Sequence, residues 1–358
     1  MRRKVMAAGL ILVLCGMMMS CRGGTSGGAA AGETTVTAES SGTAEAGQAG
    51  EAGDSSAAAE TGSAGLAAKT PASQTTAAAE NGENENAEES GTAPIMTLDE
   101  FPVTDGSLAC VPMIEELMMR FTGCTEMQAD ERVNEVFSNT NPCYLNLAAG
   151  ERDLCIAYEP AEETVEKLKD YPPLDKQPIG KDALVFIVNE NNPVDELSKQ
   201  QLMDIFTGKI HNWKEVGGAD VPIQVFTRPE TSGSQTLMRR LLVGDAEMTD
   251  EKYYYMQPTM EGMVEAIKEN YDNSEMAIGY SVYYYVESMM GTSGLKFLKV
   301  DGVDPSTEAI AGGEYSLVND FYAVVREDSP EKALQIRDWL LSEEGQTFVG
   351  ECGYVPVR

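Results

Sequence analysis

The sequence predicts an α/β protein built from two lobes, and three observations support this. Residues 22–100 contain no Phe, Tyr or Trp and are mostly small or polar, so this stretch cannot bury a core. About 260 of the 358 residues remain, which is enough for two packed lobes. Across them, apolar runs typical of strands alternate with runs at helical spacing, which favours an α/β architecture with mostly parallel sheets.

Composition and boundary residues place the individual elements. Runs rich in β-branched and apolar residues predict strands at 153–157, 183–188, 221–226, 277–280, 295–300 and 321–325. Apolar residues spaced three and four apart predict helices at 112–121, 199–207, 235–242, 260–270 and 330–342. Ser198 is the expected N-cap of the second helix, and Gly123 and Gly208 are expected to end the first two.

The first 21 residues have the pattern of a secretory signal peptide. A basic triplet at 2–4 precedes an apolar run of about fifteen residues, shorter than the ~20 that cross a bilayer as a helix. The run ends in Met-Met-Ser-Cys at 18–21, which is similar to a bacterial lipobox and implies acylation of Cys21. Ordinary secretion with a free Cys21 is the alternative. In a lipoprotein, residues 22–97 would form a disordered tether with a reach of roughly 50 Å.

Charge and composition exclude several functions. The chain has 26 Lys and Arg against 58 Asp and Glu, a formal net charge of −32, whereas a nucleic-acid binder needs a basic surface. Its single histidine, His211, excludes a His-rich metal site, and we expect His211 to be a surface or packing residue. We predict no metal, no cofactor and no catalytic residue. Five cysteines fall in the folded part: Cys110, Cys124, Cys143, Cys155 and Cys352. We expect mainly buried thiols, with a disulfide as the alternative, and assign no pairing.

Two Gly/Ser-rich turns each lead into a predicted helix. They are residues 105–110 (Asp-Gly-Ser-Leu-Ala-Cys) and 228–234 (Arg-Pro-Glu-Thr-Ser-Gly-Ser). The unpaired N–H groups of a helix N-terminus carry partial positive charge, so each turn is a candidate anion site. Arg228 could add a bidentate charged contact. A plain helix cap is the alternative for either turn taken alone.

The order of the motifs resembles the phosphate-binding lipoproteins of bacterial phosphate ABC importers. The resemblance covers residues 101–358 and is carried by segments 184–194, 202–213 (Leu-Met-Asp-Ile-Phe-Thr-Gly-Lys-Ile-His-Asn-Trp), 228–234, 277–280 and 345–356. It implies a two-lobed periplasmic-binding-protein fold of type II, each lobe a mixed sheet flanked by helices. Lobe I would comprise 98–180 and 300–358, and lobe II 181–299.

The same resemblance implies a function. The protein would be an extracytoplasmic monomer, lipid-anchored to the cell membrane. It would capture inorganic phosphate or a similar small oxyanion and deliver it, without catalysis, to the permease subunits of an ABC importer.

The resemblance also implies the binding residues of the second turn. The family's Arg-x-x-x-Ser-Gly-Thr pattern falls on Arg228, Ser232, Gly233 and Ser234. Glu230 would then hold the arginine in place.

In the first turn, Ser107 and the amides of Leu108 and Ala109 are the expected ligands, and a second hydroxyl loop falls near Ser138 and Thr140. The hydroxyl residues often seen after Ser107 are absent here.

The resemblance also implies an acidic residue that determines specificity by accepting the proton that phosphate keeps near neutral pH. The aligned position is Tyr158, and we assign the role to the neighbouring Glu159. Because a site built around a ligand hydroxyl rejects analogues that lack it, such a carboxylate would exclude sulfate.

Rival hypotheses remain open. The same fold could bind tungstate, molybdate or sulfate, or act as a sensor. A surface enzyme of phosphate metabolism and an adhesion protein using the tyrosine clusters at 253–255 and 283–285 are the rivals from other classes. No Walker lysine motif or Gly-x-Ser-x-Gly elbow supports an enzyme.

Overall fold

The computed structural model describes residues 95–248, 254–268 and 276–358. The predicted signal peptide, the predicted lipidation site Cys21 and all but the last three residues of the predicted tether lie outside this range. Within the described residues, no helix has both the length and the apolar character needed to cross a membrane.

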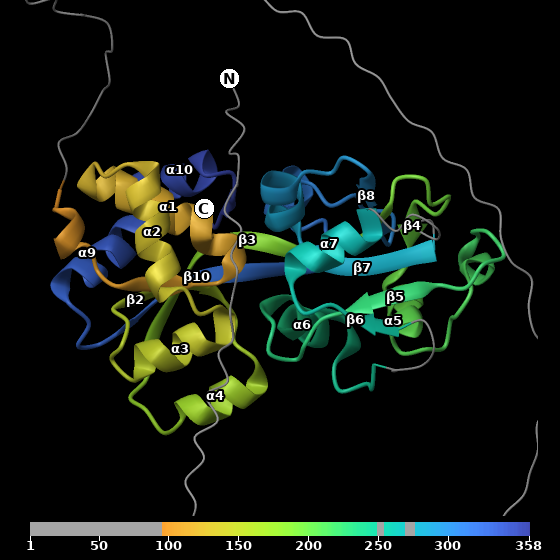
Figure 1. The fold of residues 1–358 in the computed structure, drawn as a ribbon, viewed down its shortest axis with the longest axis horizontal. Helices are drawn as coiled ribbons and strands as arrows, with labels where there is room; N and C mark the ends of the chain where they lie inside the picture. Colours follow the sequence, from red (N-terminus) through yellow and green to blue (C-terminus); the bar gives the residue numbers. More distant parts are fainter. Residues whose placement is uncertain (1–94, 249–253, 269–275) are drawn as a thin grey trace, which may run out of the picture. The chain divides into compact units, whose positions relative to one another are not determined.

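The first lobe is a sheet with helices on both faces. Its strands are β1 (Thr104–Gly106), β2 (Leu154–Tyr158), β10 (Val318–Arg326), β11 (Val355–Pro356) and the first part of β3 (Leu174–Asn189). Its helices are α1 (Val111–Thr122), α2 (Glu126–Val136), α3 (Thr140–Ala148), α4 (Glu162–Leu168), α9 (Glu331–Leu340) and α10 (Glu343–Glu351). Figure 1 shows α3 and α4 on the opposite side of the sheet from α1, α2, α9 and α10.

The second lobe contains the rest of β3. Its other strands are β4 (Glu196–Leu197), β5 (Gln224–Thr227), β6 (Tyr254–Met256), β7 (Ala277–Val282), β8 (Leu295–Phe297) and β9 (Lys299–Val300). Its helices are α5 (Lys199–Phe206), α6 (Gly233–Met238) and α7 (Met260–Lys268). π-helical turns lie at Arg239–Val243, after α6, and at Tyr285–Met290, after β7. A 3₁₀ turn lies at Trp213–Val216 in this lobe, and two more lie at Leu98–Glu100 and Leu108–Cys110 in the first lobe. Helix α8 (Thr307–Gly312) packs against both β3 and β11.

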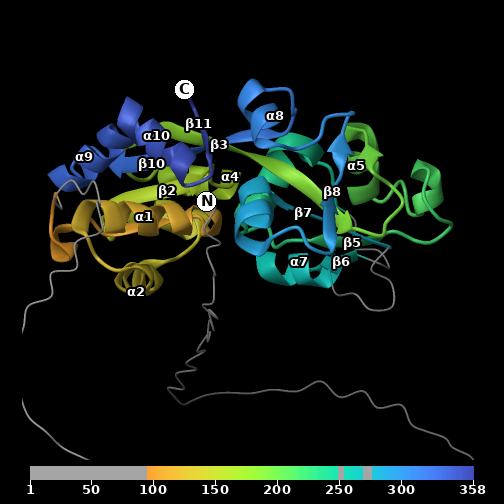
Figure 2. The same ribbon diagram turned by 90° about the horizontal axis from the view of Figure 1, so that it is seen from above.

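Strand β3 joins the lobes. Among the described residues, nine strands form one mixed sheet in the order β1-β2-β10-β3-β7-β5-β6, with β8 and β11 also paired to β3. The first part of β3 pairs with β10 and the second part with β7 and β8, all antiparallel. Figures 1 and 2 show β3 running from one lobe to the other. Two lobes connected by continuous strands are the arrangement of a hinge.

The mixed sheet predicted for each lobe is confirmed, but the expectation of mostly parallel pairing is not. Parallel pairs occur between β1 and β2, between β5 and both β6 and β7, and between β4 and β9. The central pairings of β3 and β10 are antiparallel because the chain crosses between the lobes more than once.

Most of the predicted helices and strands are present. Strand β3 is the example in which the hydrophobic pattern did not predict the full length of the element. We predicted a strand at 183–188, whereas β3 begins at Leu174. Its first part contains Lys176, Gln177 and Pro178, which carry no strand signal, and pairing with β10 keeps it extended. A register irregularity in this pairing accommodates the proline. Gly180 is required here, because a Cβ would lie 2.3 Å from the Phe321 ring.

The five cysteines within the described residues are free thiols. Cys110, Cys143 and Cys155 are buried, and Cys124 and Cys352 are partly exposed. Two of them belong to a small apolar cluster between α3 and the sheet, formed by Cys143, Tyr144, Leu147, Cys155, Ala157 and Val324. This cluster anchors α3, whose first residue belongs to the candidate site.

Candidate anion-binding site

A cavity of about 20 Å³ lies between the two lobes. The first lobe contributes Ser107, Leu108, Ala109, Asn139, Thr140 and Tyr158, and the second contributes Arg228, Gly233, Ser234, Met260 and Val282. The two turns predicted to bind an anion therefore meet at one cavity, although more than 110 residues separate them in the sequence.

The first turn is held by the end of β1. A Cβ on Gly106 would lie 2.2 Å from the Ile156 carbonyl oxygen, so the β1–β2 pairing requires glycine at this position. The Ser107 amide donates to the same carbonyl at 3.1 Å. The Ser107 hydroxyl accepts from the Tyr158 amide at 3.0 Å and lies 2.8 Å from the Thr140 hydroxyl. Two hydroxyl groups are thus fixed side by side at the cavity.

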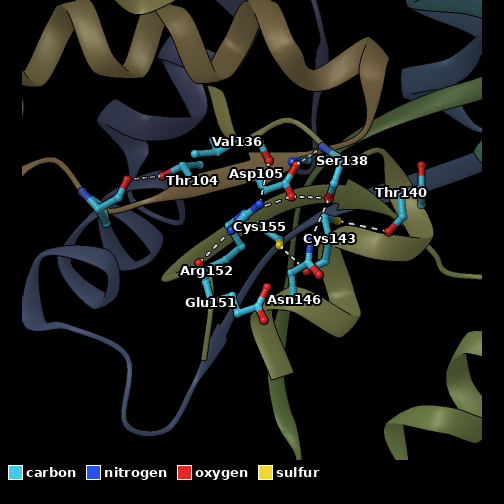
Figure 3. Close-up of polar contacts among 12 residues, drawn as sticks. Thr104, Asp105, Val136, Ser138, Thr140, Cys143, Asn146, Glu151, Arg152 and Cys155 are labelled. Carbon is cyan, nitrogen blue, oxygen red and sulfur yellow. Dashed lines mark hydrogen bonds and ion pairs between the residues drawn. The ribbon is translucent and has the colours of Figure 1, made fainter. Parts of the chain in front are cut away.

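A buried carboxylate positions the loop that carries Thr140 (Figure 3). Asp105 is fully buried and accepts from the amides of Gly106 at 2.7 Å and Ser138 at 2.9 Å. It also accepts from the Ser138 hydroxyl and from Nε of Arg152, the latter at 3.3 Å. Arg152 donates in turn to the Val136 carbonyl at 3.0 Å. Ser138 therefore serves as an anchor of the loop and is not among the cavity-lining residues.

Asn139 follows this anchor and has a backbone φ of 75°. A positive φ is uncommon for residues other than glycine, although asparagine tolerates it better than most. Strained backbone of this kind clusters at binding sites. The sequence pattern did not identify Asn139, Met260 or Val282 as lining residues, because an Asn in a polar loop and apolar residues in regular elements carry no distinctive signal.

Arg228 is the charged group of the second turn. Its backbone amide donates to the Tyr280 hydroxyl at 2.9 Å, and Nη1 donates to the Gln257 carbonyl at 3.0 Å. The side chain is buried, and its Nε has no hydrogen-bond partner among the described residues. Burial lowers the pKa of Arg228, although nearby tyrosines oppose the shift and an arginine remains charged at neutral pH.

The described residues place no carboxylate within 4 Å of the Arg228 guanidinium, and our expectation for Glu230 is corrected. Glu230 instead pairs with Arg239, with 2.6 Å between Oε1 and Nη2, and accepts from Gln235 Nε2 at 2.9 Å. A buried charge without a counter-charge is costly. The uncompensated guanidinium therefore favours an anion in the cavity.

The rest of the second turn separates into lining and supporting residues. Ser234 is fully buried, and its hydroxyl has no hydrogen-bond partner in the part of the chain described. A Cβ on Gly233 would lie 2.6 Å from the Thr140 hydroxyl oxygen, so the lobes approach too closely here for a larger residue. Ser232 does not line the cavity. It caps α6 by accepting from the Gln235 amide at 3.2 Å.

Glu159 lies outside the cavity lining, and the role we assigned to it is not supported. Its carboxylate pairs with Lys176 Nζ at 2.5 and 2.6 Å and lies 3.8 Å from Arg240 Nη1. None of the lining residues is acidic. Glu159 directly follows β2, and its carboxylate lies near one cation from each lobe, Lys176 and Arg240.

Tyr158, at the aligned position, does line the cavity. Its hydroxyl donates to Asp182 Oδ2 at 2.6 Å, while Asp182 Oδ1 accepts from the amides of Ala183 at 2.7 Å and Tyr284 at 3.1 Å. Burial raises the pKa of Asp182 to about 6, against the opposing effect of these hydrogen bonds. Asp182 lies on β3, so it links the first-lobe strand β2 to the second lobe at the hinge.

Comparison with known proteins agrees with this architecture. A family model described as a PBP superfamily domain matches residues 129–344. The chain belongs to the PBP superfamily. Among solved PBP-like structures, one described as a phosphate ABC transporter substrate-binding protein from Clostridium perfringens, with bound phosphate, has a TM-score of 0.56 and 26% identity. The alignment covers 72% of this chain and 99% of that protein. An ABC-type phosphate transport receptor from Vibrio cholerae, at 22% identity and a TM-score of 0.52, supports the fold; 70% of this chain and 98% of that one are covered.

Two curated relatives of this PBP superfamily member are phosphate-binding proteins named PstS. The Bacillus subtilis protein is 32% identical over 171 residues, which are 48% of this chain and 53% of the relative. The Borreliella burgdorferi protein is 27% identical over 265 residues, 71% of this chain and 88% of the relative. The chain thus spans about half of the first relative and most of the second.

Proposed function

We propose that this PBP superfamily protein is an extracytoplasmic solute-binding protein that captures inorganic phosphate for an ABC importer. One observation carries the proposal: the buried Arg228 guanidinium, without a carboxylate partner among the described residues, shares a small interlobe cavity with the hydroxyls of Ser107, Thr140 and Ser234. The PstS relatives and the phosphate-bound C. perfringens structure support phosphate as the ligand.

In this proposal each lobe supplies part of the binding shell. Arg228 and Ser234 bind from the second lobe, together with the amides at the start of α6. Ser107, Thr140 and the amides of Leu108 and Ala109 bind from the first. Hydrogen bonds to charged groups contribute about 1.5–3 kcal/mol each, and micromolar affinity requires about 8 kcal/mol, so a handful of such bonds suffices. Closure of the lobes would be the signal that the permease subunits recognise.

We propose binding and release without turnover. The lining residues include neither a histidine nor a carboxylate that could act as a general base toward the Ser or Thr hydroxyls. We further propose a monomer that is lipid-anchored to the cell membrane through Cys21, as the signal-like N-terminal sequence indicates.

A fully deprotonated oxyanion is the second candidate ligand. Since no acidic side chain lines the cavity, no lining carboxylate is available to accept the phosphate proton or to repel sulfate. The cavity therefore also suits sulfate, molybdate or tungstate.

Isothermal titration calorimetry separates these ligands. The protein is freed of bound anion by reversible unfolding and dialysis, then titrated with phosphate, sulfate, molybdate and tungstate. We expect phosphate to bind at micromolar or tighter concentrations, and Arg228→Gln to weaken binding at least a hundredfold, because it removes the charged contact. Arg132→Gln, an exposed arginine on α2, is the matched control. Tighter binding of another oxyanion, or unchanged affinity in Arg228→Gln, would contradict the proposal.

A further inference from the structure

One side-chain amide bridges the two lobes beside the cavity. Asn141, the second residue of α3, donates from Nδ2 to the Thr231 carbonyl at 2.8 Å. Thr231 belongs to the second anion turn, two residues before Gly233. We propose that Asn141 is a latch that stabilises the closed arrangement of the lobes and slows release of the bound anion. This inference rests on the proposed function and concerns the kinetics of the same site.

The neighbours of Asn141 determine the orientation of its amide. Oδ1 accepts from the Ala161 amide at 2.7 Å and from the Thr164 hydroxyl at 3.1 Å. Because a backbone N–H can only donate, the oxygen of Asn141 must face Ala161. The NH₂ group then necessarily faces the Thr231 carbonyl. The Asn141 side chain itself is buried, although Thr231 on the facing lobe is exposed.

Two of these hydrogen bonds lie within the first lobe and one lies between the lobes. Ala161 and Thr164 belong to the start of α4, which packs against α3 in the first lobe. Thr231 lies between β5 and α6 of the second lobe. The bond to Thr231 therefore forms only when the lobes are together, whereas the bonds to α4 are independent of closure. A contact made in one of two conformations shifts their populations by its own free energy.

Other contacts support closure in the same region. Gly233 of the second lobe lies against Thr140, the residue that directly precedes Asn141. Arg240, from the π-helical turn after α6, donates to the Asn319 side chain on β10 and lies 3.8 Å from Glu159. The last pair is partly exposed and contributes little. The hydrogen bond from Asn141 has a buried donor side chain and a length of 2.8 Å, so we expect it to contribute more.

Asn141→Asp tests the latch specifically. The carboxylate keeps an oxygen for Ala161 and Thr164 but places a second oxygen against the Thr231 carbonyl, so only the interlobe bond is lost. With inorganic phosphate as the probe, we expect release in a ³²P-phosphate chase to become about tenfold faster, and the association rate to stay within about threefold. The faster release should persist in 0.5 M NaCl, which screens the added charge.

Two further arms complete the test. Asn134→Asp adds the same charge on the exposed face of α2 and should leave release unchanged. Energy transfer between fluorophores on non-natural residues at the exposed positions 162 and 219 reports lobe closure without any ligand; Asn141→Asp should lower the closed fraction. If wild-type protein binds no phosphate, the proposed function fails, and the energy-transfer arm alone decides the latch. Wild-type release and an unchanged closed fraction in Asn141→Asp would overturn it.

Discussion

Glu230 is paired with Arg239, not with Arg228, although only two positions separate it from Arg228 in the sequence. The pair lies on the surface side of α6, with the Arg239 side chain 32% and the Glu230 side chain 64% exposed. The turn therefore separates its charges: the carboxylate is neutralised at the surface, and the Arg228 guanidinium keeps its charge for the cavity.

This separation predicts that Glu230 is dispensable for binding. In Glu230→Gln we expect the phosphate affinity to stay within about threefold and the free energy of unfolding to fall by less than ~1 kcal/mol, because exposed ion pairs contribute little. Calorimetry and urea denaturation measure the two quantities. An affinity loss as large as that of Arg228→Gln would show instead that Glu230 orients Arg228.

Gly233→Ala should separate affinity from stability. The new methyl group would lie 2.6 Å from the Thr140 hydroxyl oxygen, so the lobes would have to move apart to accommodate it. Overpacking of this kind costs about 1–3 kcal/mol, and here it would appear as an affinity loss of about tenfold or more. The melting temperature of the anion-free protein should change little, since the three nearest atoms to the new methyl group all belong to Thr140 on the facing lobe.

Gly350→Ala on α10 is the control for that substitution, because its methyl group would meet only Pro356 at an ordinary 3.5 Å. Equal affinities for the Gly233→Ala variant and wild type would mean that the two turns do not close on each other.

Asp105→Asn should destabilise the first lobe. The carboxylate is fully buried and bonded to Gly106, Ser138 and Arg152, whose side chain is only 18% exposed. Removing one partner of a buried pair leaves the other charge uncompensated and typically costs ~3 kcal/mol. Urea denaturation should show this loss, together with weaker binding because the Thr140 loop loses its anchor. Asp130→Asn, at an exposed site on α2, should show neither effect.

Stability should also depend on pH through Glu115 on α1. Burial, and then repulsion from Asp130, Glu126 and Glu116, raises the pKa of Glu115 from 4.5 to about 7. The folded state thus holds this proton more tightly than the unfolded chain, so Glu115 makes the free energy of unfolding fall as pH rises from about 4.5 to about 7.

Glu115→Gln should remove that fall. The variant should match wild type near pH 4.5 and exceed it at pH 8 by about 1 kcal/mol, a figure reduced for the partial exposure of the side chain. Urea denaturation across this pH range measures the difference, with the exposed Glu131→Gln as the comparison. Parallel stability curves for the wild type and the Glu115→Gln variant would contradict the prediction.

Local signals identified much of the architecture. Ser198 accepts from the Gln201 amide at the start of α5, and Gly123 takes a φ of 68° at the end of α1, as the capping patterns predicted. These features depend on neighbours within a few residues. The sequence of the turn at 228–234 likewise indicated Arg228, Gly233 and Ser234 as site residues, and all three line the cavity.

What the sequence by itself determined is the set of α/β elements and the two turns with anion-binding chemistry. Only the tertiary structure decided which side chains share the cavity. Ser234 and Thr140 line the cavity, whereas Ser232 caps α6 and Ser138 anchors a loop. The sequence cannot distinguish these roles, because all four side chains carry a hydroxyl and only the direction in which each side chain points decides its role. The tertiary structure also paired Glu159 with Lys176 and Glu230 with Arg239, since charge pairing depends on distances in space that spacing along the chain does not specify.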